Sequence, residues 1–126
     1  MDDNILSGKV IGAAIEVHKT LGPGLLESVY QRCLLYELAR MGLSVQKEAL
    51  LPVRYKELLF SDAYRMDLLI EDCLIVELKA VEKIQPVHSA QLLSYLKLSG
   101  IELGLLINFN VAKLADGVKR ISNKKL

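Results

Sequence analysis

The sequence predicts an α/β (α+β) fold in which a four-stranded mixed β-sheet is flanked by helices. Apolar residues recur at helical spacing near both ends of the chain and again after Pro86, whereas the segments 44–81 and 101–109 have the alternating or continuous apolar runs of strands. The expected order of elements is ααβββαβα, and a crossover helix between the third and fourth strands makes the sheet mixed. At 126 residues the chain is expected to form one domain, 1–126.

Two helices are expected first. Residues 4–20 place their apolar side chains on one stripe, and Asp3 or Asn4 can cap the start of this helix. The stretch "LGPG" (21–24) breaks it. A second helix is expected over 25–42 and ends at a glycine, a usual C-terminal signal.

Three strands are expected next. The segment 45–55 contains Pro52, which predicts an edge strand or a bulged strand. Strands 64–70 and 74–81 follow, and the three residues 71–73 between them are an accepted hairpin length.

The last third of the chain is expected to return to helices around one more strand. Pro86 is a typical first-turn residue for a helix that runs to Gly100. A buried strand over 101–109 and an amphipathic helix over 111–121 complete the fold.

Composition favours a well-packed globule, since 52% of the residues are hydrophobic and 25% are charged. The net charge of +1 argues against a strongly electrostatic nucleic-acid binder. Cys33 and Cys73 have no CxxC spacing, so we expect free thiols and a cytoplasmic location. The N-terminus has no signal-peptide pattern, and no apolar run approaches the roughly 20 residues that span a bilayer.

The register of the central hairpin follows from its apolar faces. Each strand has one uniformly apolar face, and both must lie on the same side of the sheet. The resulting cross-strand pairs are Ile70 with Leu74, Leu68 with Val76, and Met66 with Leu78. The same register puts Asp67 opposite Glu77 and Arg65 opposite Lys79. Directly opposed Cβ atoms are roughly 4.5–5.5 Å apart.

Two carboxylates at that separation repel each other unless a proton or a cation lies between them. A divalent metal is one resolution, because Mg²⁺ favours one or two carboxylates with water and phosphate oxygens. Lys79, on the same face as Glu77, could then orient a water or stabilise developing charge. The alternative is a ladder of charges on a solvated face, with Asp67 and Glu77 neutralised by Arg65 and Lys79. The pattern alone leaves both open.

The spacing of Asp67 and Glu77-Leu78-Lys79 at a hairpin resembles the motif of the PD-(D/E)XK nuclease superfamily. Met66 stands where the proline of that motif would be. The stretch "QLLSY" (91–95) is similar to a Q-x3-Y element that follows the motif in some members. The expected order of elements is also that of a PD-(D/E)XK nuclease-like core.

A narrower resemblance starts in "GLLESVY" (24–30), which carries the signature of the GxxExxY family of small bacterial and archaeal proteins. Its residues here are Gly24, Glu27 and Tyr30. Further similar segments, such as "VELKAV" and "AQLLSYLKLSG", extend the resemblance over nearly the whole chain.

The resemblance implies a divalent-metal-dependent nuclease that acts on nucleic acid, with DNA as the expected substrate. Asp67, Glu77 and the carbonyl of Leu78 would hold Mg²⁺ or Mn²⁺. Glu27 would bind through water or ligate a second ion, and Lys79 would orient the attacking water.

Three more residues are implied in supporting roles. Gln91 would support the site, Tyr30 would position Glu27, and Tyr95 would stack or donate a hydrogen bond. The superfamily also implies a homodimer, and the lack of a long apolar run leads us to expect no membrane partner. The alternative function is a non-catalytic nucleic-acid- or protein-binding assembly module that keeps the nuclease fold, which the small size and near-neutral charge favour.

Overall fold

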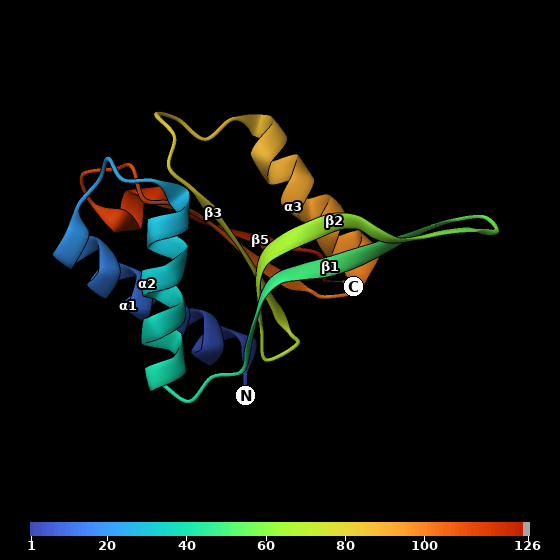
Figure 1. Ribbon diagram of the computed structural model, residues 1–126, viewed down its shortest axis with the longest axis horizontal. Helices are drawn as coiled ribbons and strands as arrows, with labels where there is room; N and C mark the ends of the chain where they lie inside the picture. The colour runs from blue at the N-terminus through green and yellow to red at the C-terminus, as the bar shows by residue number, and fades with distance from the viewer. Residues whose placement is uncertain (125–126) are drawn as a thin grey trace.

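The computed structural model describes residues 1–124, which form an α+β structure with three α-helices and a five-stranded mixed sheet (Figure 1). In chain order the elements are α1 (Asp3–Leu21), α2 (Glu27–Arg40), β1 (Val45–Tyr55), β2 (Leu58–Ile70), β3 (Leu74–Lys79), α3 (Pro86–Ser99), β4 (Leu103–Asn108), the short 3₁₀ turn η1 (Leu114–Gly117) and β5 (Val118–Ser122). None of the helices in this described part is both long and apolar enough to cross a bilayer.

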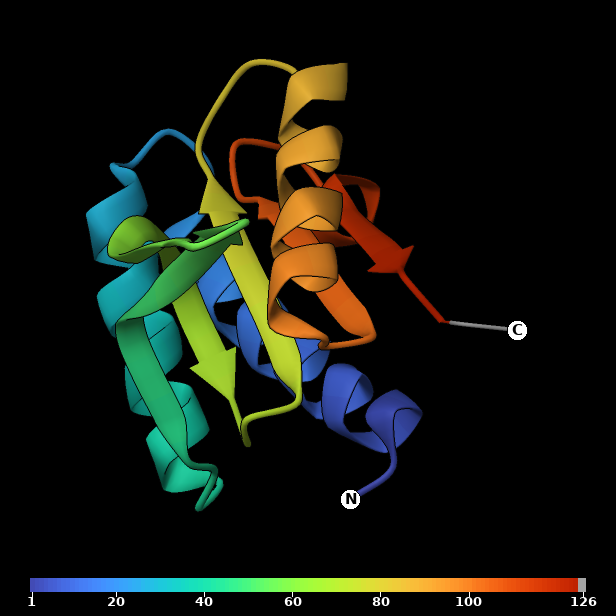
Figure 2. The same ribbon diagram turned by 90° about the vertical axis from the view of Figure 1, so that its right-hand side faces the viewer.

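The strands lie side by side in the order of the sequence, β1-β2-β3-β4-β5. Only β3 and β4 run parallel, and α3 makes the crossover between them. Helices α1 and α2 cover one face of the sheet, while α3 covers the other (Figure 2). The result is a three-layer arrangement of helices, sheet and helix.

Apolar side chains fill both interfaces between these layers. Leu34 of α2 packs in the larger core with Val76 of β3, whereas Leu92 of α3 packs in the smaller core with Ile75. Successive residues of β3 thus enter opposite cores, as strand geometry requires. Burial on both faces explains why β3 reads as a nearly continuous apolar run.

The closing helix expected over 111–121 is wrong, and the sheet has five strands rather than four. This segment forms η1 and then β5, which pairs antiparallel with β4. Every residue of β4 is buried, so an unpaired edge there would leave buried backbone groups without partners. Gly117 also lies against the carbonyl of Asn108, where no side chain fits. Pairing of the β4 edge therefore outweighs the helical spacing of the apolar residues.

Three local features can be compared with the sequence: the cap of α1, the bulge at Pro52 and the loop between β2 and β3. The cap of α1 is Asp2 rather than Asp3 or Asn4, because its carboxylate accepts the first free amides of the helix. The bulge expected at Pro52 is confirmed on the edge strand β1. Asp72 has a left-handed backbone in the hairpin loop, with φ of 54°, a conformation that aspartate tolerates.

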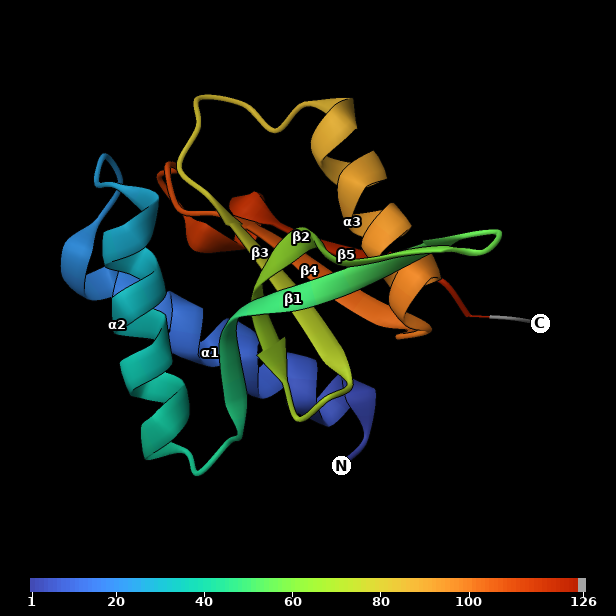
Figure 3. The ribbon, with the colours of Figure 1, turned by 45° about the vertical axis from the view of Figure 1, so that its right-hand side comes forward.

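Strand β2 begins at Leu58, six residues before the strand that the sequence predicts. These extra residues pair with β1 and form a hairpin that extends well beyond the body of the molecule (Figure 3). The sequence gives little sign of this extension, because its side chains alternate only weakly between apolar and polar.

Candidate functional site

The site lies where β2 and β3 separate. The two strands pair Leu68 with Val76 and Ile70 with Leu74, the register that the apolar faces predict. The pairing ends at Leu68, and Asp67 is the first residue of β2 beyond it. From there β2 continues beside β1 alone.

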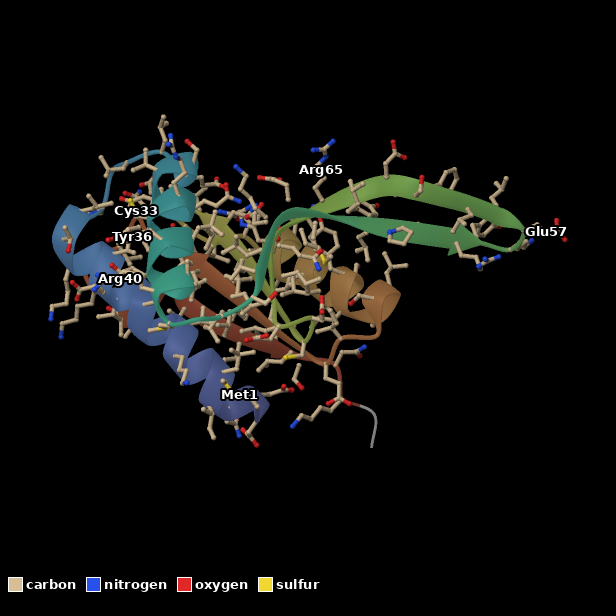
Figure 4. All side chains as sticks on the ribbon, turned by 60° about the horizontal axis from the view of Figure 1, so that its bottom comes forward. Met1, Cys33, Tyr36, Arg40, Glu57 and Arg65 are labelled. Atoms are coloured by element: carbon tan, nitrogen blue, oxygen red, sulfur yellow. The ribbon has the colours of Figure 1, made fainter. Side chains whose placement is uncertain are left out.

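Two further expected pairs do not form. The ladder between β2 and β3 stops at Leu68 and Val76, so Met66 does not pair with Leu78 and Arg65 does not pair with Lys79. Lys79 instead lies beside Asn108 of the parallel strand β4. The reason is that β2 leaves β3 beyond Leu68 and continues beside β1 alone. Arg65 is exposed on the outside of this hairpin (Figure 4), which removes it from the expected charge ladder.

The carboxylates of Asp67 and Glu77 bridge the fork, because each accepts a backbone amide from the opposite strand. The amide of Asp67 donates to Oε2 of Glu77 at 2.7 Å, and the amide of Leu78 donates to Oδ2 of Asp67 at 2.8 Å. These two amides lie just past the end of the ladder, so the carboxylates take the place of the missing strand partners. The two carboxylates therefore lie close together, as expected from the predicted register, which puts Asp67 opposite Glu77.

Both carboxyl groups favour the protonated form more than usual. Burial and then the charge of Asp67 raise the pKa of Glu77 to about 8, against the opposing effects of the Asp67 amide and Lys79. Burial also raises the pKa of Asp67, although the Leu78 amide and Lys79 oppose it. Glu77 is only 5% exposed, which makes desolvation the main cause. The pair thus carries a charge that the surrounding protein compensates incompletely.

A cavity of about 180 Å³ opens beside Asp67. Its lining consists of Glu27, Ser28, Gln31, Glu48, Asp67 and Leu78. Glu27 is the first residue of α2, so the start of this helix faces the fork across the cavity. The charges of Glu27 and Glu48 raise the pKa of Asp67 further. The structure therefore brings the carboxylate of α2 to that of β2, forty residues away in the sequence.

Tyr30 holds the turn that precedes α2. Its hydroxyl donates to the carbonyl of Gly22 at 2.6 Å and accepts from the amide of Leu25 at 3.1 Å. Its ring is fully buried and stacks on Phe109, with 4.4 Å between the ring centroids. These contacts fix where Glu27 enters the cavity, without a direct hydrogen bond between Tyr30 and Glu27 among the described residues.

Three cavity residues, Ser28, Gln31 and Glu48, were missed from the sequence, and the last two are hydrogen-bonded to each other. Nε2 of Gln31 donates to Oε1 of Glu48 at 3.2 Å and to the carbonyl of Asp67 at 3.1 Å. Gln31 lies one helical turn after Glu27, a spacing that could have suggested it. Glu48 has a left-handed backbone with φ of 54°, and no residue pattern signals this for a glutamate within a strand.

The two candidates on α3 differ in position. Tyr95 is buried with its ring tilted against Tyr64, and burial followed by the charges of Glu77 and Asp67 raises its pKa to about 12. The hydroxyl of Tyr95 is therefore close enough to the two carboxylates for their charge to affect its pKa. Gln91, one turn earlier, is exposed and does not line the cavity beside Asp67.

The donors at the fork fit a small divalent cation. Each carboxylate uses one oxygen to accept an amide, and the other oxygen makes no further hydrogen bond to residues 1–124. Hard oxygen donors and an uncompensated negative charge suit Mg²⁺ or Mn²⁺. Across this described part, however, no three acidic, histidine or cysteine side chains converge as a ready ligand group. The fit is therefore that of a two-carboxylate site with Glu27 at the far wall of the cavity.

Comparison with known proteins agrees with this geometry. A family model of the PD-(D/E)XK nuclease superfamily matches residues 4–121, and the chain belongs to this superfamily. The superfamily resemblance carried by Asp67 and Glu77-Leu78-Lys79 is thus confirmed. No curated protein and no solved structure matches the chain significantly.

Proposed function

We propose that the protein is a divalent-metal-dependent nuclease that hydrolyses phosphodiester bonds, with DNA as its substrate. The observation that carries this proposal is the buried pair of Asp67 and Glu77 beside Lys79. Keeping two carboxyl groups together in a buried place costs free energy of folding, because the pKa of Glu77 is raised to about 8, and a purely structural fork would not require this. A bound divalent cation would supply the missing compensation.

The proposed roles follow the positions of the donors. Asp67, Glu77 and the carbonyl of Leu78 would hold Mg²⁺ or Mn²⁺, and Glu27 would bind through water or ligate a second ion. The ion, when bound, polarises a phosphate oxygen and makes a water more acidic. Lys79 orients the attacking water and stabilises the charge that grows on the phosphoryl oxygens.

The narrower family, the homodimer and the supporting residues are proposed from the sequence resemblance and from where the structure places these residues. We assign the chain to the GxxExxY family through Gly24, Glu27 and Tyr30, and the contacts of Tyr30 with the turn before Glu27 give that spacing a physical purpose. We also propose a homodimer. Tyr95 would donate toward the carboxylate pair, whereas a supporting role for Gln91 rests on the resemblance alone.

Cleavage of single- and double-stranded DNA and RNA with Mn²⁺ or Mg²⁺ tests the proposed chemistry. We expect Lys79→Ala to lower the cleavage rate about 100-fold or more, the loss typical of removing one charge-stabilising group. Lys97→Ala on the exposed surface of α3 is the matched control and should cleave at the wild-type rate. Equal rates in the two variants, or cleavage that persists in EDTA, would exclude this chemistry.

The second candidate is a binding module that keeps the fold without cleaving. The lack of a ready three-ligand group in the described residues and the net charge of +1 favour it. Nucleic-acid binding without cleavage in either metal, unchanged by Lys79→Ala, would support this alternative over the nuclease.

A further inference from the structure

Residues 52–63 form an arm, the part of the β1–β2 hairpin that leaves the body of the molecule (Figures 1 and 3). Every residue of the arm is exposed except Val53, which is half-buried. The root of the arm is anchored where Tyr64 packs against Tyr95 of α3. Beyond that contact the arm is an isolated two-stranded ribbon, which is marginally stable in water by itself.

One face of the arm is apolar. The cross-strand pairs Val53–Phe60 and Tyr55–Leu58 are two residues apart and so share this face. The intervening pair on the opposite face is Arg54–Leu59. Tyr55, Leu58 and Phe60 are 60%, 57% and 48% exposed, which is unusual for side chains of this size gathered together.

The area of the apolar face matches what a pair of arms could bury. Four side chains with this exposure present roughly 300–400 Å² of apolar surface per arm. Two such faces, with their polar borders, would bury roughly 1,000 Å² in total, which is the lower limit for a specific interface and the size of a weak, reversible dimer. A second arm therefore provides enough surface without any other partner.

The charge and pattern of the arm favour a second copy over nucleic acid. Arg54 and Lys56 are balanced by Glu57 and Asp62, so the arm neither attracts a phosphate backbone nor repels its own copy. Each of its two apolar rows joins one aromatic to one aliphatic side chain. If a two-fold axis lay between the two faces and ran across the strands, the pair Val53–Phe60 of one copy would pack on the pair Tyr55–Leu58 of the other. Such a face is complementary to itself, as a symmetric dimer requires.

We propose that two copies of the chain dimerise by packing the apolar faces of their arms together, through Val53, Tyr55, Leu58 and Phe60. This interface specifies the homodimer that is part of the proposed function. Its test uses neither metal nor nucleic acid, so a failed dimer and a failed nuclease are distinguishable.

Sedimentation velocity in EDTA, from about 1 to about 100 μM protein, measures the association across the range where interfaces of this size dissociate. Leu58→Asp places a charge on the apolar face, whereas Leu59→Asp places the same charge on the opposite face at a leucine of nearly equal exposure. We expect a dimer for the wild type and for Leu59→Asp. Leu58→Asp should weaken dimerisation at least about tenfold, since it buries an unpaired charge.

The melting temperature of each variant, measured at the lowest protein concentration, controls for folding. It should stay at the wild-type value, because the arm contacts neither core. Tyr55→Ser is a milder second variant that should also weaken the dimer. A wild type that is monomeric at about 100 μM overturns the proposal, even if Leu58→Asp reduces binding of DNA. Equal dimerisation of the Leu58 and Leu59 variants overturns it as well.

Discussion

The carboxylates of Glu77 and Asp67 lie beside each other at the fork, which gives the site opposing electrostatic effects. Each accepts a backbone amide that favours the charged carboxylate, yet burial and mutual repulsion outweigh this and raise both pKa values. A group whose pKa is higher in the folded state than in the unfolded state binds its proton more tightly when folded. The metal-free protein therefore loses stability as pH rises from the unfolded pKa of Glu77 to its folded pKa.

The first prediction concerns this pH window. In EDTA, the free energy of unfolding should fall between about pH 4.5 and about pH 8 by up to a few kcal/mol, with Glu77 as the main contributor. Glu77→Gln keeps an oxygen that can accept the Asp67 amide but removes the charge, so it should flatten this dependence and stabilise the metal-free protein at pH 8. Urea denaturation at both pH values measures the difference.

Glu57→Gln at the exposed tip of the arm is the control for this experiment and should retain the wild-type pH dependence. If Glu77→Gln shows the same loss of stability with pH as the wild type, the buried pair does not carry the repulsion described above.

Among the elements, the sequence predicts what is decided within one strand or one helix. The apolar faces of β2 and β3 are sufficient to align Leu68 with Val76, and this alignment brings Asp67 to Glu77. The features that the sequence did not predict depend on contacts between residues far apart in the sequence. β5 exists because β4 needs a partner at its edge, and Glu48 faces the cavity only because β1 departs from regular backbone geometry.

Gly117 tests the corrected end of the fold. A methyl group there would meet the carbonyl of Asn108, so Gly117→Ala should destabilise the protein by about 2 kcal/mol or more and disturb the pairing of β5. Gly12→Ala in the exposed middle of α1, where a methyl group meets nothing, should instead stabilise the protein by up to about 1 kcal/mol. Thermal and urea denaturation distinguish the two. Equal effects of both substitutions would contradict the placement of η1 and β5 against β4.

On the scale of the whole molecule, the layered fold assembles one site from distant segments. The start of α2, the irregular part of β1 and the fork of β2 and β3 meet around a single cavity. Glu27, Asp67 and Glu77 could be selected from the sequence because each has a recognisable local pattern. Gln31 had only its spacing after Glu27 to suggest it, and Glu48 had no pattern at all, since their contacts arise where α2 meets β1.

Calorimetric titration of Mn²⁺ into the protein is the most direct test of the proposed metal site. Asp67→Asn keeps a carbonyl oxygen that can accept the Leu78 amide but removes the charge at the fork, whereas Asp62→Asn makes the same change at an exposed residue of β2. The account predicts binding to the wild type and to Asp62→Asn, with a loss of at least about tenfold in affinity for Asp67→Asn. Equal affinity in all three proteins, or no binding to the wild type at millimolar Mn²⁺, would contradict it.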